Sequence, residues 1–273
     1  MGIKLVSNEK IAETSSKGNQ EKWRENGRWY KLDQFGYEAL AETLISILLE
    51  RSNIEKDTPF TFVRYQMERL NVHGHERTGC SSTNFCVEEQ AIITLSHLFR
   101  QYYGTPLVEL LSRQSSDKKR IAYLADATTE LTGLDCFPQY LTLMFEVDAL
   151  FLNDDRHLNN IAVIERGGKF DYCPIFDQGA GLLSNTQLLP MDIAPKALIA
   201  SQKARPFNTT FNRQAGTARA LYGVQLIMPH LSRKEIEKEL SVLLPYYAER
   251  DRSIITDRVC ETILTRQQES LCK

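Results

Sequence analysis

The sequence predicts an α+β fold in which a small β-rich lobe precedes a larger helical lobe. Strand-like residues and turn signals dominate the first part of the 273-residue chain, and helical periodicity dominates from about residue 88 onward. A cluster of Asp and Asn residues interrupts the helical part near its middle. We expect one domain over residues 1–86 and another over 87–273, with the polar cluster at their junction, where ligand sites often form.

The composition is that of an ordinary soluble protein, with 42% hydrophobic and 25% charged residues. The formal net charge of -2 gives no basic excess, so we expect no nucleic-acid partner. No apolar run reaches the roughly 18 residues that a membrane span needs, so we expect no membrane partner. The six cysteines form no CxxC pair, which favours reduced thiols and a cytoplasmic location.

The smaller lobe is predicted from alternating strand and helix signals. Asn26-Gly27 is a strong hairpin-turn signal, and strands are expected over 11–16 and 28–33. Apolar residues over 35–51 recur every three or four positions, as on one face of a helix. The aromatic and β-branched run at 60–65 predicts a strand, and the polar stretch at 70–85 predicts a further strand or hairpin.

The larger lobe is predicted to be mainly helical. Its expected helices are 89–102, 117–132, 138–152, 232–247 and 251–268. An irregular stretch from 153 to about 187 lies between them and contains short strand-like pieces at 161–165 and 170–173.

The polar cluster is Leu152-Asn153-Asp154-Asp155-Arg156-His157-Leu158-Asn159-Asn160, placed between an apolar helix and a short apolar strand. Asp155 and Asn160 are five residues apart. This is the spacing of a kinase catalytic loop, in which Asp orients the acceptor hydroxyl and Asn binds magnesium.

A second polar segment is Phe176-Asp177-Gln178-Gly179, which follows a short strand. Asp177 is a candidate carboxylate ligand for Mg²⁺, and Gly179 is expected to permit a sharp turn. Gly167-Gly168 predicts the turn of a β-hairpin over 161–175, which would bring Asp177 back beside Asp155.

These two segments together resemble the catalytic core of atypical kinases. The DRHxxN form of residues 155–160 is similar to phosphoinositide 3/4-kinases. The chain length and the order of segments are more similar to the C-terminal kinase region of HipA-like bacterial serine/threonine kinases. The resemblance implies a bilobal protein-kinase-like fold, ATP with Mg²⁺, and phosphorylation of protein hydroxyls.

The N-terminal part supports the HipA-like resemblance. Residues 15–22, Ser-Ser-Lys-Gly-Asn-Gln-Glu-Lys, resemble the SxxGxQxK phosphate loop of that family. Ser15, Ser16, Gly18 and Asn19 are therefore candidate nucleotide-binding residues, since backbone N–H groups and small polar side chains can meet phosphate oxygens. The family also implies autophosphorylation at the position of Ser15. A polar surface turn is the alternative for this loop.

Lys31 matches the family lysine that pairs with the α- and β-phosphates of ATP. Its helix partner is either Glu38 or Glu42, and Glu38 is preferred because it lies nearer the helix start. His157 is assigned structural or transition-state support. Asp148, on the apolar helix, either braces the catalytic loop or faces solvent.

The function expected from these residues is ATP- and Mg²⁺-dependent phosphorylation of Ser or Thr in a protein, including the chain itself. A small-molecule or lipid kinase and a nucleotide-binding regulatory module are the alternatives. A protein substrate and an antitoxin-like protein are the expected partners.

Overall fold

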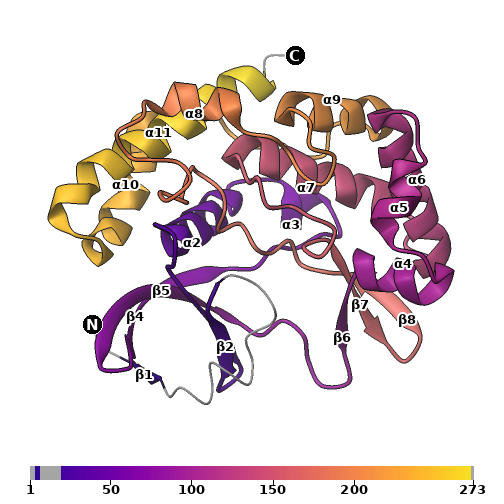
Figure 1. Cartoon of the computed structure of the whole chain (residues 1–273), viewed down its shortest axis with the longest axis horizontal. Helices are drawn as coiled ribbons and strands as arrows, with labels where there is room; N and C mark the ends of the chain where they lie inside the picture. The colour runs from indigo at the N-terminus through magenta and orange to yellow at the C-terminus, as the bar shows by residue number, and fades with distance from the viewer. Residues whose placement is uncertain (1–3, 7–19, 272–273) are drawn as a thin grey trace.

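The computed structural model describes residues 4–6 and 20–271. A twisted sheet carries helix α2 (Glu38–Leu49) on one face, and most of the remaining helices lie on the far side of α2 or beyond the end of the sheet (Figure 1). The five strands of this sheet run in the order β1-β4-β5-β3-β2. Their bounds are β1 (Lys4–Val6), β2 (Lys22–Glu25), β3 (Arg28–Leu32), β4 (Tyr65–Val72) and β5 (His75–Thr83).

The hairpin predicted at Asn26-Gly27 is confirmed. It joins β2 to β3, and both turn residues have positive φ, 48° and 71°, which this tight turn requires. Strand β1 pairs with β4 in parallel, whereas the other neighbours in the sheet are antiparallel. The strand predicted at 11–16 lies outside the described residues.

Helix α2 confirms the helix predicted from the 35–51 periodicity. It packs against β3, β4 and β5 on one side and against α10 (Arg233–Leu243) on another. Because it is covered from several sides, all of its residues except Ile47 are buried. Two buried glutamates, Glu38 and Glu42, are therefore held among apolar neighbours, where a carboxylate requires partners.

Two predicted elements differ from the structure. The run at 60–65 forms no sheet strand before Tyr65, where β4 begins. Phe62 instead makes an isolated bridge with Ile175, and Phe60 and Phe62 are buried in the core. The helix predicted at 89–102 begins only at Leu95. The β-branched residues before it form β6 (Ala91–Thr94), which pairs with β7 (Ala162–Arg166).

The second sheet, β6-β7-β8, is antiparallel, with β8 at Lys169–Tyr172. The β7–β8 hairpin turns at Gly167 and Gly168, whose φ values are 57° and 81°, as the sequence predicts. It brings the chain back toward the first sheet directly before Asp177. The predicted domain boundary at residue 86 falls between β5 and β6 and stays a prediction.

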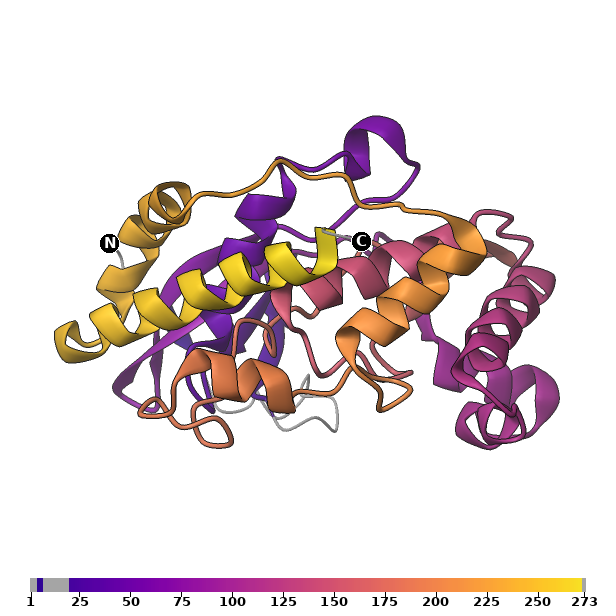
Figure 2. The ribbon, with the colours of Figure 1, turned by 90° about the horizontal axis from the view of Figure 1, so that it is seen from above.

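The helices follow the predicted pattern with additions. Helix α7 (Phe137–Phe151) is central, and α9 (Phe211–Tyr222) and α11 (Glu249–Leu271) run alongside it (Figure 2). The predicted helices at 117–132, 232–247 and 251–268 correspond to α6 (Asp117–Thr132), α10 with the short η1 (Leu244–Tyr246), and α11 (Glu249–Leu271). Helix α4 is Leu95–Tyr103. The helices not predicted are α3 (Ile54–Asp57), α5 (Leu107–Ser112), α8 (Pro195–Ser201) and α9 (Phe211–Tyr222).

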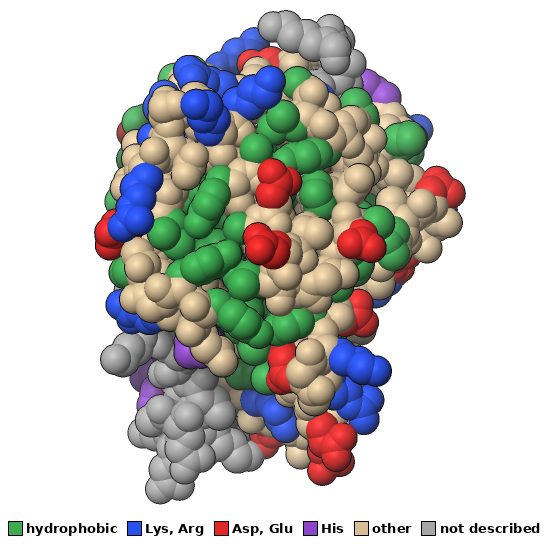
Figure 3. All heavy atoms as spheres, turned by 90° about the vertical axis from the view of Figure 1, so that its right-hand side faces the viewer, with side chains coloured by type: hydrophobic (Ala, Val, Ile, Leu, Met, Phe, Trp, Pro, Cys, Tyr) green, Lys and Arg blue, Asp and Glu red, His purple; other side chains and the backbone are tan. Residues whose placement is uncertain are grey.

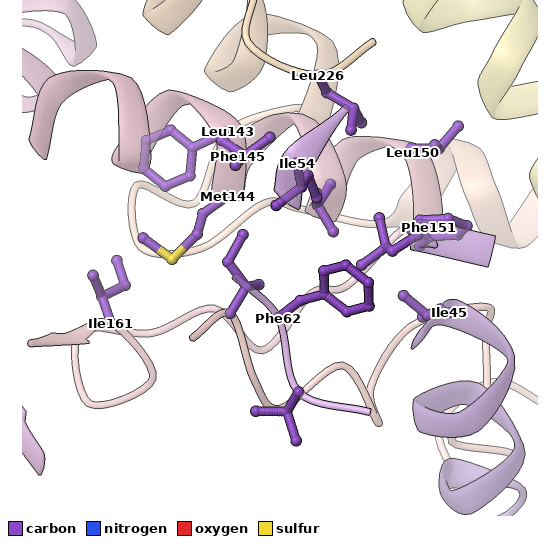
Figure 4. Packing of buried hydrophobic residues seen from close by; sticks show 14 of the residues in the cluster. Ile45, Ile54, Phe62, Leu143, Met144, Phe145, Leu150, Phe151, Ile161 and Leu226 are labelled. Carbon is purple, nitrogen blue, oxygen red and sulfur yellow. The ribbon is translucent and has the colours of Figure 1, made fainter. Parts of the chain in front are cut away.

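One hydrophobic core joins the two parts of the chain. Ile45 of α2 and Phe151 of α7 belong to the same buried cluster, with Phe62 beside them (Figure 4). Burial of such side chains contributes about 1.5–3 kcal/mol each. The position of α2 is therefore coupled through the core to the end of α7, where the polar cluster begins.

The end of the molecule formed by α4, α5 and α6 shows hydrophobic side chains at its surface, with acidic ones among them (Figure 3). Exposed residues of α4 and α5 include Tyr102, Tyr103 and Val108. Over the described part of the chain, no helix combines the length and the apolar character needed to cross a bilayer.

Candidate active site

Lys31 lies at the centre of the site. It is on β3, and its Nζ lies 2.5 Å from Glu42 Oε1 on α2 and 2.5 Å from Asp177 Oδ1. Burial alone would lower the pKa of Lys31, but the charges of Asp177 and Glu42 outweigh it and raise that pKa well above its usual value. The structure thus brings together residues from β3, α2 and the segment after β8 around one ammonium group.

The prediction that Glu38 is the partner of Lys31 is wrong. Its carboxylate accepts hydrogen bonds from the backbone N–H groups of Phe35 (2.7 Å) and Gly36 (3.0 Å), directly before α2. These two N–H groups lie directly before α2 and bond the carboxylate of Glu38, which is in the first turn of the helix. Glu42 lies one turn further along, and its Oε2 also accepts from the N–H of Gln178, at 2.8 Å. Glu42 therefore links Lys31 to the segment that carries Asp177.

Asp177 is held in a left-handed conformation with φ of 63°. Burial alone would raise its pKa, but the charge and hydrogen bond of Lys31 lower it to about 2. Its carboxylate is consequently ionised at neutral pH, as a magnesium ligand must be. The sharp backbone turn that we expected at Gly179 is instead at Asp177, whose φ is positive. At Gly181, an added Cβ would lie 2.9 Å from Ile45 Cδ1 and 3.1 Å from the Phe151 carbonyl oxygen.

The loop that carries Asp155 and Asn160 begins after α7, at a left-handed Leu152. Asp155 is 60% exposed, so an acceptor group can reach its carboxylate from solvent. Asn160 donates its side-chain N–H to the Asp155 carbonyl, at 2.9 Å. This bond uses the amide nitrogen of Asn160 and leaves its Oδ1 as the atom for a cation.

His157 lies beside Asp155, with Nε2 3.7 Å from Asp155 Oδ2. Burial raises the pKa of Asp155, His157 opposes that increase, and Asp177 adds to it. The two predicted segments lie side by side, because Asn153 accepts from the Asp155 N–H (3.3 Å) and donates to the Asp177 carbonyl (3.2 Å). The role predicted for His157, support of the site, stays a prediction.

Asp148 and Arg156 form a brace beneath the loop, and both are almost fully buried. Arg156 donates from Nε to Asp148 Oδ2, at 3.0 Å. Its Nη1 donates to the carbonyls of Asn160 (3.0 Å) and Phe176 (2.7 Å). One side chain thus ties Asn160 to Phe176, the residue before Asp177. Of the two alternatives for Asp148, the structure shows the bracing one.

Two further side chains of the site had no assigned role in the sequence. The side-chain amide of Asn153 donates to Asp148 Oδ1, the Asp177 carbonyl and Gln178 Oε1, at 3.0–3.2 Å. Lys22 lies opposite Lys31 in the β2–β3 register. Burial lowers the pKa of Lys22, and Asp177 opposes this effect. Lys22 is the last residue of the predicted phosphate-loop motif, so this motif could have identified it as a residue of the site.

The rest of the predicted phosphate loop, Ser15, Ser16, Gly18 and Asn19, lies outside the described residues. Asn160 and Asp177 offer one amide and one carboxylate oxygen, hard ligands that fit Mg²⁺ when phosphate oxygens complete its shell. Within residues 4–6 and 20–271, no group of three or more His, Cys, Asp or Glu is arranged to hold a metal ion by itself.

Comparison with solved structures identifies the fold. The Helicobacter pylori proinflammatory kinase CtkA superposes with a TM-score of 0.62 and 13% identity, over 93% of this chain and 89% of that one. A Shewanella oneidensis HipA, solved with HipB and operator DNA, gives 0.47 and 11% identity, over 94% of this chain and 65% of that one. No family model and no curated protein matches the sequence. The chain therefore has a kinase fold over most of its length, as the resemblance implied.

Proposed function

We propose that this chain is an ATP- and Mg²⁺-dependent kinase that phosphorylates Ser or Thr hydroxyls of a protein, including its own. The observation that carries the proposal is the network in which Lys31 bonds Glu42 and Asp177, next to the Asp155–Asn160 loop. A kinase requires this set: a lysine for the phosphates, two oxygen ligands for magnesium, and a carboxylate for the acceptor.

Each residue has a chemical task in this proposal. Lys31, fixed by Glu42, holds the α- and β-phosphates, and Asn160 and Asp177 hold Mg²⁺. The metal, when bound, neutralises charge on the phosphates. Asp155 orients the acceptor hydroxyl and receives its proton. The hydroxyl oxygen then bonds to the γ-phosphorus, while the bond to the bridging oxygen of ADP breaks.

The exposure of Asp155 favours a protein acceptor. Its carboxylate is 60% exposed, whereas sites for small molecules usually enclose their ligand. A Ser or Thr on a protein loop can approach such an open position without a pocket of its own. The antitoxin-like partner depends on the sequence resemblance and stays a prediction.

The test is incubation of the purified protein with ATP and Mg²⁺, followed by mass spectrometry of the chain and of added protein substrates. We expect a phosphoryl group to be gained, at Ser15 among other sites. Asp155→Ala should lower transfer by roughly 10²–10⁴-fold. Asp177→Ala should abolish Mg²⁺-dependent nucleotide binding in calorimetry.

Asp171→Ala is the matched control, because Asp171 is an exposed carboxylate on β8. Full transfer by Asp155→Ala would exclude Asp155 from the reaction. Transfer only to small alcohols or lipid headgroups would indicate the small-molecule or lipid kinase. Nucleotide binding without any transfer would indicate a regulatory module.

A further inference from the structure

The segment at residues 179–194, which follows Asp177, is held against the start of α2 by backbone hydrogen bonds. The N–H of Tyr37 donates to the Ser184 carbonyl at 3.2 Å, and the N–H of Thr186 donates to the Phe35 carbonyl at 3.0 Å. The approach is so close that a Cβ at Gly36 would lie 2.1 Å from the Ser184 carbonyl oxygen. The 179–194 segment thus has a defined path along its first half.

Arg258 of α11 also holds the 179–194 segment. Its guanidinium donates to the carbonyls of Leu183 (2.9 Å), Leu189 (3.1 Å) and Pro190 (3.0 Å). It also donates to the hydroxyl of Tyr37, at 3.2 Å, and that hydroxyl donates to the Leu182 carbonyl, at 2.8 Å. Arg258 is only 1% exposed, so this cation is buried among carbonyl dipoles.

These bonds hold part of the segment in an unfavourable backbone conformation. Leu182 and Leu183 both have positive φ, 56° and 58°, a conformation that costs energy for residues other than glycine. Such a conformation persists only where its surroundings over-determine it. Tyr37 and Arg258 bond the carbonyls of these two leucines.

The segment offers no free hydroxyl for an activating phosphate. Between residues 179 and 194 the sequence contains two hydroxyl side chains, Ser184 and Thr186, and no tyrosine. Ser184 is fully buried and its hydroxyl donates to the Gly179 carbonyl at 2.5 Å. The hydroxyl of Thr186 donates to the Phe35 carbonyl at 3.0 Å.

The arginine of the catalytic loop is not free to receive a phosphate either. In kinases that are switched by phosphorylation, new arginine–phosphate pairs order the activation segment. Here Arg156 is 0% exposed and donates to Asp148 and to two carbonyls. A phosphate on this segment would find Arg156 already bonded and out of reach.

We propose that Arg258, with Tyr37, presets the 179–194 segment, so that the site of the proposed kinase is assembled without phosphorylation of this segment. Arg258 is a positioning residue that acts through the segment. The segment is tied to the site by the bond from the Leu182 N–H to the Phe151 carbonyl (2.7 Å), at the end of α7. It is tied also through Tyr37, which directly precedes the helix of Glu42.

The first test measures hydrogen exchange of the phosphatase-treated protein, which needs no activity. We expect slow exchange of the amides of 182–189 in the wild type. Arg258→Met should speed their exchange while α7 stays protected. Arg250→Met is the matched control, because Arg250 is on the same helix and 88% exposed. Fast exchange in the phosphate-free wild type, or no effect of Arg258→Met, would overturn the proposal.

The second test measures transfer by the same phosphate-free protein, confirmed by intact mass. We expect full activity from the first turnover, and a kcat about 100-fold lower in Arg258→Met with a smaller change in the KM for ATP. Guanidinium ions, but not methylammonium at equal ionic strength, should partly restore Arg258→Ala, which a fold defect alone would not allow.

A lag in phosphoryl transfer that disappears once residues 179–194 are phosphorylated would overturn the proposal that this segment is preset. The proposed kinase function would be unaffected. Absence of transfer by the wild type under every condition would instead contradict the kinase function. The exchange measurement would then still show whether Arg258 holds the segment.

Discussion

Two clusters of charged side chains, one around Lys31 at the centre of the candidate active site and one around Arg156 beneath its loop, are built differently. Around Arg156, the guanidinium donates to a buried carboxylate and two carbonyls, and Asp148 also accepts from Asn153. Around Lys31, one ammonium is shared by Glu42 and Asp177, and the carboxylate of Asp177 is 26% exposed. The first cluster is saturated and enclosed, whereas the second, with Lys22 nearby, leaves the carboxylate of Asp177 partly open to solvent.

This difference separates bracing from binding. A buried charge that is fully hydrogen-bonded has no capacity left for a ligand, and its removal leaves an uncompensated partner. The partly exposed carboxylate of Asp177, by contrast, suits a cation such as Mg²⁺, and the lysine suits phosphate. The predictions below test this comparison, beginning with the largest expected effect.

Arg156→Met should destabilise the protein by about 3–5 kcal/mol, because it leaves Asp148 buried without its cation. Denaturant unfolding with a constant m-value measures this loss. The double variant Asp148→Asn/Arg156→Met should recover much of it, since no unpaired charge remains. Equal stabilities of the wild type and Arg156→Met would show that the cluster is not a brace.

Glu42→Gln should lower kcat/KM for ATP by roughly 10–100-fold, which corresponds to the loss of a hydrogen bond to a charged group. Lys31 keeps Asp177 but loses the carboxylate on α2. Glu38→Gln is the control at the same helix face and should cost much less, because the Glu38 carboxylate accepts from the backbone N–H groups of Phe35 and Gly36. The reverse order of the two losses would restore Glu38 as the partner of Lys31.

Asp33 should make stability fall as pH rises. Burial raises its pKa to about 8, against the opposing bonds from the Ala39 N–H and the Tyr247 hydroxyl. Because its unfolded pKa is about 3.9, the folded state binds the extra proton between about pH 4 and 8, and stability declines there.

The slope from this single group is at most about 1.4 kcal/mol per pH unit. Asp33→Asn should flatten the decline, as measured by denaturant unfolding at a series of pH values. An unchanged slope in the variant would show that Asp33 is ionised in the folded protein. Asp177 gives the opposite sign, because its lowered pKa stabilises the fold above about pH 4 and the contribution is lost as pH falls.

Local signals predicted much of the fold. Helix α6 has the predicted bounds, and the turns at Asn26-Gly27 and Gly167-Gly168 lie where the sequence places them. Each depends on neighbours a few residues away, so the pattern is sufficient. The 60–65 run has strand composition, but the core of α2 and α7 takes up its aromatic side chains, and this competition is not visible locally.

The candidate site was predictable as far as its motifs extend. The spacing of Asp155, Asn160 and Asp177 identified residues that the structure brings together. The choice between Glu38 and Glu42 was not predictable, because both lie on one face of α2, one turn apart. Only the crossing of β3 over the helix determines which of them meets Lys31.

The sequence by itself determined which functional groups are present. They are the polar side chains between residues 153 and 160, Asp177 after its hairpin, and a lysine on a strand. The tertiary structure decided which charges are paired and buried. Arg156, Glu42 and Arg258 acquire their roles from contacts with residues far away in the chain. The energy of a buried charge depends on the groups around it in space, and local sequence patterns do not specify those groups.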